Sequence, residues 1–224
     1  MRWPWRRQRW YGQRGEDRTL AALLRHRRRR RGFYIDVGAW DPVQDSVTKH
    51  FYDRGWRGVN VEPHPLYHGK LCEARPRDVN LAVALSDEEG ELDLYVIGRT
   101  GLATFASEFA RSGAEWAAEH RNLQTGAEPL RVAVTTLAAL CREHVPPGTD
   151  IDFLKIDVEG WEERVLRGGE WAVYRPYILC VEAVEPLTDR PSWQAWDGFV
   201  LAQGYEFLDF DGLNRWYRRR DVRS

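Results

Sequence analysis

The feature that most constrains the fold of this chain is a regular alternation of short apolar runs with helix-like segments. The first run, at 33–37, contains aromatic and β-branched residues, and helical spacing follows it at 46–54. Further strand-like runs, separated by helix-like segments, lie at 58–61, 79–85, 132–134, 151–156 and 177–184. Strands that alternate with helices predict a mainly parallel sheet with helices on both faces, an α/β sandwich.

The end of the chain has a different pattern. Strand-like segments at 205–210 and 215–217 flank Asp211-Gly212, a strong turn signal between antiparallel strands. A mainly parallel sheet can carry such a hairpin at one edge. Because the chain contains no internal repeat and no linker rich in serine and glycine, a single catalytic domain over 32–220 is the simplest arrangement.

Composition excludes several classes of protein. The 224 residues include 11 Trp, 9 Tyr and 8 Phe, too many for a disordered chain, and no run is apolar and long enough for a transmembrane helix. Charges at 13–18 interrupt the apolar stretch that a signal peptide needs. The three cysteines are far apart and lack metal-site spacing, so we expect a reduced, cytoplasmic protein.

The net charge of −1 conceals an uneven distribution, because residues 1–31 contain twelve arginines and two acids. We expect this segment to be a basic arm followed by a helix that ends near the arginines at 27–31, where cations are favourable. The Arg- and Trp-rich start at 2–10 suits a membrane interface, nucleic-acid phosphates and bases, or a solvated terminus. The acidic remainder of the chain would repel nucleic acid, which makes that partner unfavourable.

Polar residues follow the expected strands, at the edge where open α/β sheets bind ligands. The first strand leads into Asp36-Val37-Gly38-Ala39, with Trp40 where a dinucleotide-binding motif would need its second glycine. This disfavours a nicotinamide dehydrogenase but allows a nucleoside without phosphates. Glu62 ends the second strand and could accept the hydroxyl hydrogens of a ribose. Alternatively, the segment at Gly38 is an ordinary turn between a strand and a helix, and Glu62 is an exposed loop carboxylate without a ligand.

The fourth strand ends in a dense group of charges at 155–160, with Lys155, Asp157 and Glu159, and the next strand adds Glu182. Burying unpaired charges is costly, so this cluster favours a functional site. A salt-bridge network around Lys155 is the alternative. After the third strand, Asn80 and Ala82 could frame an adenine, although strand packing explains them equally well.

The residues of several segments together resemble the FkbM-type methyltransferases, which use S-adenosylmethionine and usually methylate a hydroxyl oxygen. The matching segments lie at 33–39, 55–63, 152–160 and 211–215, and the segment at 11–17 is similar to an upstream element of the family with Gly12 in place of a serine. The run Lys-Ile-Asp-Val-Glu-Gly at 155–160 is the most specific of these. Trp40-Asp41 departs from the pattern, since many relatives carry Asn followed by Gly or His.

The resemblance implies a Rossmann-like class I methyltransferase fold, with a mainly parallel seven-stranded sheet and an antiparallel edge hairpin. It also implies a small-molecule acceptor such as a sugar unit or a secondary metabolite. The cofactor-binding residues that we expect on this basis are Asp36, Gly38, Ala39, Asp41, Ser46, Glu62, Pro63, Asn80 and Ala82. The segments at 100–105 and 107–121 are expected to face the acceptor.

For catalysis, a hydroxyl acceptor needs a general base, and Asp157 is the first candidate, followed by Glu182 and Glu159. Alternatively, Asp157 and Glu182 could chelate Mg²⁺. Histidine side chains can also act as general bases, but the sequence around each of four candidates fits a solvated helix or loop better than a catalytic position: His50, His64, His68 and His144. Two further hypotheses remain: an RNA-binding protein or RNA methyltransferase that uses the basic arm, and a catalytically silent scaffold that keeps the cofactor pocket.

Overall fold

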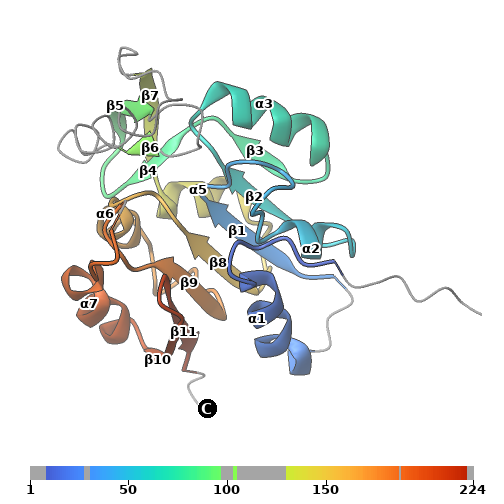
Figure 1. Ribbon diagram of the computed structural model, residues 1–224, viewed down its shortest axis with the longest axis vertical. Helices are drawn as coiled ribbons and strands as arrows, with labels where there is room; N and C mark the ends of the chain where they lie inside the picture. The colour runs from blue at the N-terminus through green and yellow to red at the C-terminus, as the bar shows by residue number, and fades with distance from the viewer. Residues whose placement is uncertain (1–8, 28–30, 97–102, 105–129, 187, 221–224) are drawn as a thin grey trace, which may run out of the picture.

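The computed structural model of the chain describes residues 9–27, 31–96, 103–104, 130–186 and 188–220. Its centre is a seven-stranded sheet with the order β10-β11-β9-β8-β1-β2-β3 (Figure 1). Five strands run parallel to one another: β1 (Phe33–Val37), β2 (Arg57–Val61), β3 (Val79–Leu81), β8 (Phe153–Ile156) and β9 (Ile178–Glu182). The hairpin of β10 (Tyr205–Phe210) and β11 (Asn214–Arg219) closes one edge in antiparallel pairing. The predicted sheet is therefore confirmed, including the turn at 211–212.

Successive side chains of each strand point to opposite faces of this sheet, and each face packs in its own hydrophobic cluster. Along β1, Ile35 and Val37 contribute to one cluster and Tyr34 to the other. The first cluster includes residues of α5 (Leu137–His144), α6 (Glu162–Arg167) and α7 (Asp197–Ala202). The second includes residues of α1 (Glu16–Leu23) and α2 (Lys49–Tyr52). Helices thus cover both faces, as the alternation of elements predicted.

The segment expected to be one strand at 79–85 is two short strands in different sheets, so that prediction was wrong. After β3 the chain leaves the central sheet, and β4 (Ala84–Ser86) joins a second sheet of order β4-β7-β5-β6 (Figure 1). Its other strands are β5 (Gly90–Val96), β6 (Ala103–Thr104) and β7 (Leu130–Thr136). A continuous apolar run does not reveal a change of sheet, because both strands need the same residue types.

Helix boundaries follow local capping chemistry. The hydroxyl of Thr136 accepts a hydrogen bond of 3.1 Å from the backbone N–H of Ala139 and thereby caps α5. The helix expected at 46–54 is shorter, since α2 comprises Lys49–Tyr52. The hydroxyls of Ser46 and Thr48, which precede it, are instead bonded to Arg75 and Asp36. The helix α3 (Pro65–Ala74) follows β2, and α7 was not predicted.

The N-terminal segment packs against the catalytic sheet. Leu20 and Leu24, in and just after α1, lie in the same cluster as Tyr34 and Phe153 of β1 and β8. A helix that was expected to belong to a basic arm therefore contributes to the core of the domain expected to begin at residue 32. The start of the arm, at 1–8, lies outside the described residues. Across the part of the chain that the structure describes, no helix has the length and apolar character needed to cross a membrane.

Candidate active site

Two charged residues face each other across neighbouring parallel strands below the carboxyl edge of the sheet. Asp36 of β1 is in register with Lys155 of β8, and both are buried. The Lys155 ammonium nitrogen lies 3.4 Å from Oδ1 of Asp36 and 3.3 Å from Oδ2 of Asp157, and it donates a 2.7 Å hydrogen bond to the carbonyl oxygen of Gly38. Burial alone would lower the pKa of Lys155, but the Asp157 and Asp36 carboxylates raise it above its usual value.

Gly38 allows the end of β1 to approach the end of β8. Its φ is 76°, and a Cβ placed on it would lie 1.8 Å from the carbonyl oxygen of Asp157, a distance that no side chain tolerates. Two residues later, Trp40 also has a left-handed φ, 47°. This conformation explains why an asparagine would suit position 40, since Asn adopts it more readily than Trp does.

Glu62 is held in place by the turn that Gly38 makes. Its two carboxylate oxygens accept hydrogen bonds of 2.8 Å from the backbone N–H groups of Trp40 and His64. Glu62 is buried, and burial raises the pKa of its carboxyl, although the two backbone hydrogen bonds and Lys155 oppose that shift. Each oxygen keeps a lone pair for a further donor, so Glu62 is a preoriented acceptor of ligand hydroxyls.

A cavity of about 330 Å³ lies at this edge, between the central sheet and the second sheet. Apolar side chains from both sheets line part of it, including Val37, Val61, Leu85 and Leu94. Six of the residues predicted to form the site line the cavity together: Gly38, Ala39, Glu62, Pro63, Asp157 and Glu159. The sequence-based placement of a ligand site beyond these strand ends is therefore supported by the geometry.

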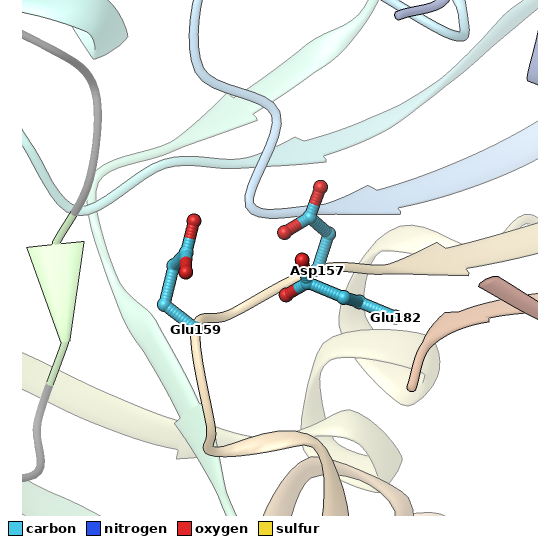
Figure 2. Close-up of side chains that lie close together, drawn as sticks. All are labelled: Asp157, Glu159 and Glu182. Carbon is cyan, nitrogen blue, oxygen red and sulfur yellow. The ribbon is translucent and has the colours of Figure 1, made fainter. Parts of the chain in front are cut away.

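Three carboxyl groups gather where β8 and β9 end. Figure 2 shows the side chains of Asp157, Glu159 and Glu182 close together, and one oxygen of each lies within 4.8 Å of the others. Burial and the Asp157 and Glu162 carboxylates raise the pKa of Glu159 to about 8. Burial and the Asp157 and Glu159 carboxylates raise the pKa of Glu182 well above its usual value. Burial and mutual repulsion thus favour protonation of Glu159 and Glu182, and the cluster gains negative charge only as these carboxyl groups lose their protons.

Six other predicted residues do not line the cavity. Asp36 and Glu182 lie directly behind lining residues, beside Lys155 and Asp157 respectively. Asp41 forms an ion pair of 2.9 Å with Lys70 and caps the turn at 43–44, and Ala82 is exposed.

Ser46 and Asn80 belong to a buried polar network around Arg75. The Ser46 hydroxyl accepts a 2.9 Å hydrogen bond from Arg75, and Asn80 donates to the Arg75 carbonyl oxygen at 3.1 Å. Oδ1 of Asn80 also accepts a 2.8 Å bond from Asn60. These contacts support the alternative interpretation of Asn80, in which it stabilises the sheet.

The structure adds cavity residues that had no predicted role. Gln13 and Glu16, before and at the start of α1, line the cavity together with Asn214 of β11. The Asn214 side chain donates to Glu16 at 3.3 Å and so joins two segments that are 198 positions apart. These residues lie in the segments at 11–17 and 211–215, which resemble the FkbM family. This resemblance was the one feature of the sequence that pointed to them.

The four histidines considered as bases do not line the cavity. His50 is buried rather than solvated, and its ring stacks on Trp10 with centroids 4.2 Å apart. His64 caps α3, and Nε2 of His68 lies 3.2 Å from the carbonyl oxygen of Asn80. Among the residues that the structure describes, the titratable side chains that line the cavity are thus carboxylates, the Lys155 ammonium group and the Cys180 thiol.

Comparison with known proteins supports the same interpretation. The model of the FkbM methyltransferase domain matches residues 36–207. A curated relative, methyltransferase sdnD of Sordaria araneosa, is 29% identical over 185 residues, which cover 73% of this chain and 70% of the relative.

Two solved structures are similar at a lower level. One is a TehB-like SAM-dependent methyltransferase of Corynebacterium glutamicum, with 10% identity, a TM-score of 0.46, and 90% of this chain and 87% of that chain covered. The other is the Burkholderia thailandensis 1,6-didemethyltoxoflavin-N1-methyltransferase, with 13% identity, a TM-score of 0.44, and 93% and 80% covered. Because both TM-scores are below 0.5, we assign the fold from the strand order of the sheet and not from these two structures. Because the family match spans most of the chain, including Gly38, Glu62 and Asp157, this protein belongs to the FkbM family of S-adenosylmethionine-dependent methyltransferases.

Proposed function

We propose that this chain transfers a methyl group from S-adenosylmethionine to a hydroxyl oxygen of a small molecule, such as a sugar unit or a secondary metabolite. The observation that carries the proposal is a single cavity with two kinds of carboxylate. Glu62 follows β2 and is held by backbone N–H groups, while Asp157 and Glu159 follow β8 beside a buried lysine. The first suits a ribose, and the second suits an acceptor hydroxyl.

The cavity fits the methyl donor on chemical grounds. Glu62 would accept hydrogen bonds from the ribose hydroxyls, and the turn at Gly38 and Ala39 would border the methionine part. The surrounding carboxylates suit the positive sulfonium, and Val61, with other apolar side chains of the lining, provides surface for a base. When bound, the donor supplies an electrophilic methyl group on a positively charged sulfur.

Asp157 is the residue that we assign as general base. It lines the cavity, whereas Glu182 lies behind it, and Lys155 holds one of its oxygens at 3.3 Å. In this position Asp157 would take the proton of the acceptor hydroxyl as the oxygen attacks. Positioned general bases of this kind accelerate reactions by roughly 10²–10⁴-fold.

The size of the cavity is that of a small-molecule site. At about 330 Å³ it is near the lower end of the range for ligand sites, which run from about 300 to 1,000 Å³. Of the segments expected to face the acceptor, 107–121 and all of 100–105 except 103–104 lie outside the described residues, as does the start of the basic arm. The alternative RNA substrate therefore receives no support from the described part of the chain.

A direct test uses the purified full chain, S-adenosylmethionine with a ¹³C-labelled methyl group, and a panel of sugars, polyhydroxylated metabolites, amines and RNA. We expect label in a methoxy group of a small molecule, identified by its carbon chemical shift. Label on nitrogen, or on RNA alone, would contradict the proposal. The Asp157→Asn variant serves as the control for transfer that does not depend on the base.

A further inference from the structure

The three carboxyl groups of Asp157, Glu159 and Glu182 are arranged closely enough to share one ligand. One oxygen from each lies within 4.8 Å of the other two. This is the separation of two opposite oxygen ligands that each lie about 2.4 Å from a common ion, and smaller separations correspond to neighbouring ligands. A single cation could therefore contact all three groups after small side-chain adjustments (Figure 2).

Glu182 supplies an independent observation. Its exposed fraction is 7%, and its Oε2 atom is buried without a hydrogen-bond partner among the described residues. An unsatisfied buried carboxylate oxygen is costly, because it has lost its hydration without a replacement. Figure 2 shows this carboxyl group beside that of Asp157, so the group that carries the unpartnered oxygen belongs to the cluster.

The charge balance of the cluster also favours a cation. The Lys155 ammonium group is shared between Asp36 and Asp157, at 3.4 and 3.3 Å. Glu162, which is fully buried, adds a further carboxyl group, although its Oε1 atom accepts backbone hydrogen bonds from Val158 and Gly160. One lysine thus faces several carboxyl groups, and a divalent ion would offset the negative charge that they carry once their protons are displaced.

We propose that Asp157, Glu159 and Glu182 bind one divalent cation of the kind that prefers oxygen ligands, such as Mg²⁺, Mn²⁺ or Ca²⁺. Three protein carboxylates leave coordination positions open, as in sites that bind substrate. If the proposed function is correct, the hydroxyl oxygen of the acceptor fills one of these positions, and the ion orients it beside Asp157. Ion binding itself does not depend on that reaction.

The test measures binding of Mn²⁺ to the full chain without methyl donor or acceptor, by the loss of the free-ion signal in electron paramagnetic resonance. We expect one saturable site per chain, with competition by Mg²⁺ or Ca²⁺. Glu182→Gln should weaken Mn²⁺ binding at least tenfold. Glu163→Gln is the matched control, because Glu163 is in the neighbouring α6, is paired with Arg167 and lies outside the cluster, and it should leave binding unchanged.

Absence of saturable binding at millimolar Mn²⁺, or equal affinity in the Glu182→Gln variant and the unaltered chain, would overturn the proposal. If Glu182→Gln does not fold, as judged by circular dichroism, Glu159→Gln provides the same test at a less buried position. Binding of S-adenosylhomocysteine, measured in parallel by calorimetry, separates the two proposals. If the nucleoside binds and Mn²⁺ does not, only the proposed ion site is wrong. If Mn²⁺ binds and the nucleoside does not, only the proposed function is wrong.

Discussion

The ammonium group of Lys155 donates a hydrogen bond of 2.7 Å to the carbonyl oxygen of Gly38, and thereby joins the ends of β8 and β1 beneath the cavity. The same ammonium group lies between the carboxylates of Asp36 and Asp157. One buried side chain thus connects the glycine turn on the cofactor side with the carboxylate assigned as base. This connection leads to the first prediction.

Replacing Lys155 with methionine should destabilise the fold by about 3–5 kcal/mol, because two carboxylates lose their buried partner. Urea unfolding followed by circular dichroism measures the change. Lys49→Met is the control, since the ion pair of Lys49 with Asp53 is more exposed and should contribute less than about 1 kcal/mol. A similar loss in both variants would mean that the buried contacts of Lys155 add nothing specific.

Gly38→Ala should impair both stability and cofactor binding. The added Cβ meets the backbone oxygen of Asp157 at 1.8 Å, and a φ of 76° is unfavourable for alanine, so the ends of β1 and β8 must move apart. We expect a loss of roughly 1–3 kcal/mol from the backbone strain alone. Gly69→Ala, which meets nothing within 4 Å, is the matched control, and thermal melting compares the two. An unchanged melting temperature for Gly38→Ala would contradict the close approach.

Glu62→Ala should weaken binding of S-adenosylhomocysteine by at least about tenfold, because each hydrogen bond to a charged group contributes about 1.5–3 kcal/mol. Isothermal titration calorimetry gives the dissociation constant. Glu73→Ala changes an exposed carboxylate of α3 and should have no effect. Equal affinities for all three proteins would exclude Glu62 as the ribose acceptor.

Nucleoside affinity should also depend on pH through Glu62. Burial raises the pKa of this carboxyl above its usual value of 4.5, so its proton is gained before ordinary glutamates gain theirs as the pH falls. The protonated group is a poorer acceptor, and the affinity should decline as the pH is lowered toward 5. Because the pKa of Glu62 is higher in the folded state than in the unfolded state, its protonation at low pH favours folding. A loss of affinity at low pH would therefore not come from unfolding caused by Glu62. Calorimetry from pH 8 to 5 should show the decline in the unaltered chain and a flatter profile for Glu62→Gln.

Asp157→Asn should keep S-adenosylhomocysteine affinity within about threefold while turnover falls by roughly 10²–10⁴-fold, as expected for removal of a general base. Asp93→Asn, at a partly exposed position of β5 where Asp93 is paired with Arg131, should retain turnover. Single-turnover kinetics with the acceptor identified above separate binding from transfer. Full activity of Asp157→Asn would move the role of base to another residue.

Much of the fold could be predicted because its determinants are local. The β1 segment and the turn at Asp211-Gly212 each depend on neighbouring residues, and the structure confirms both. The division of 79–85 between two sheets was not predictable in this way. It depends on pairing with β7, whose residues lie about fifty positions away along the chain.

The residues of the candidate site also fall into two groups, those that local sequence predicts and those that tertiary packing places. Gly38, Glu62 and Asp157 follow strands, and parallel strands bring their carboxyl ends to one edge, so the sequence by itself determined that these residues meet. Tertiary structure alone decided that Glu16 meets Asn214 at the cavity and that Asn80 belongs to a polar network elsewhere. The reason is physical. Strand ends are set by local hydrophobic periodicity, whereas contacts between distant segments depend on how whole elements pack, and neither residue type nor spacing encodes that packing.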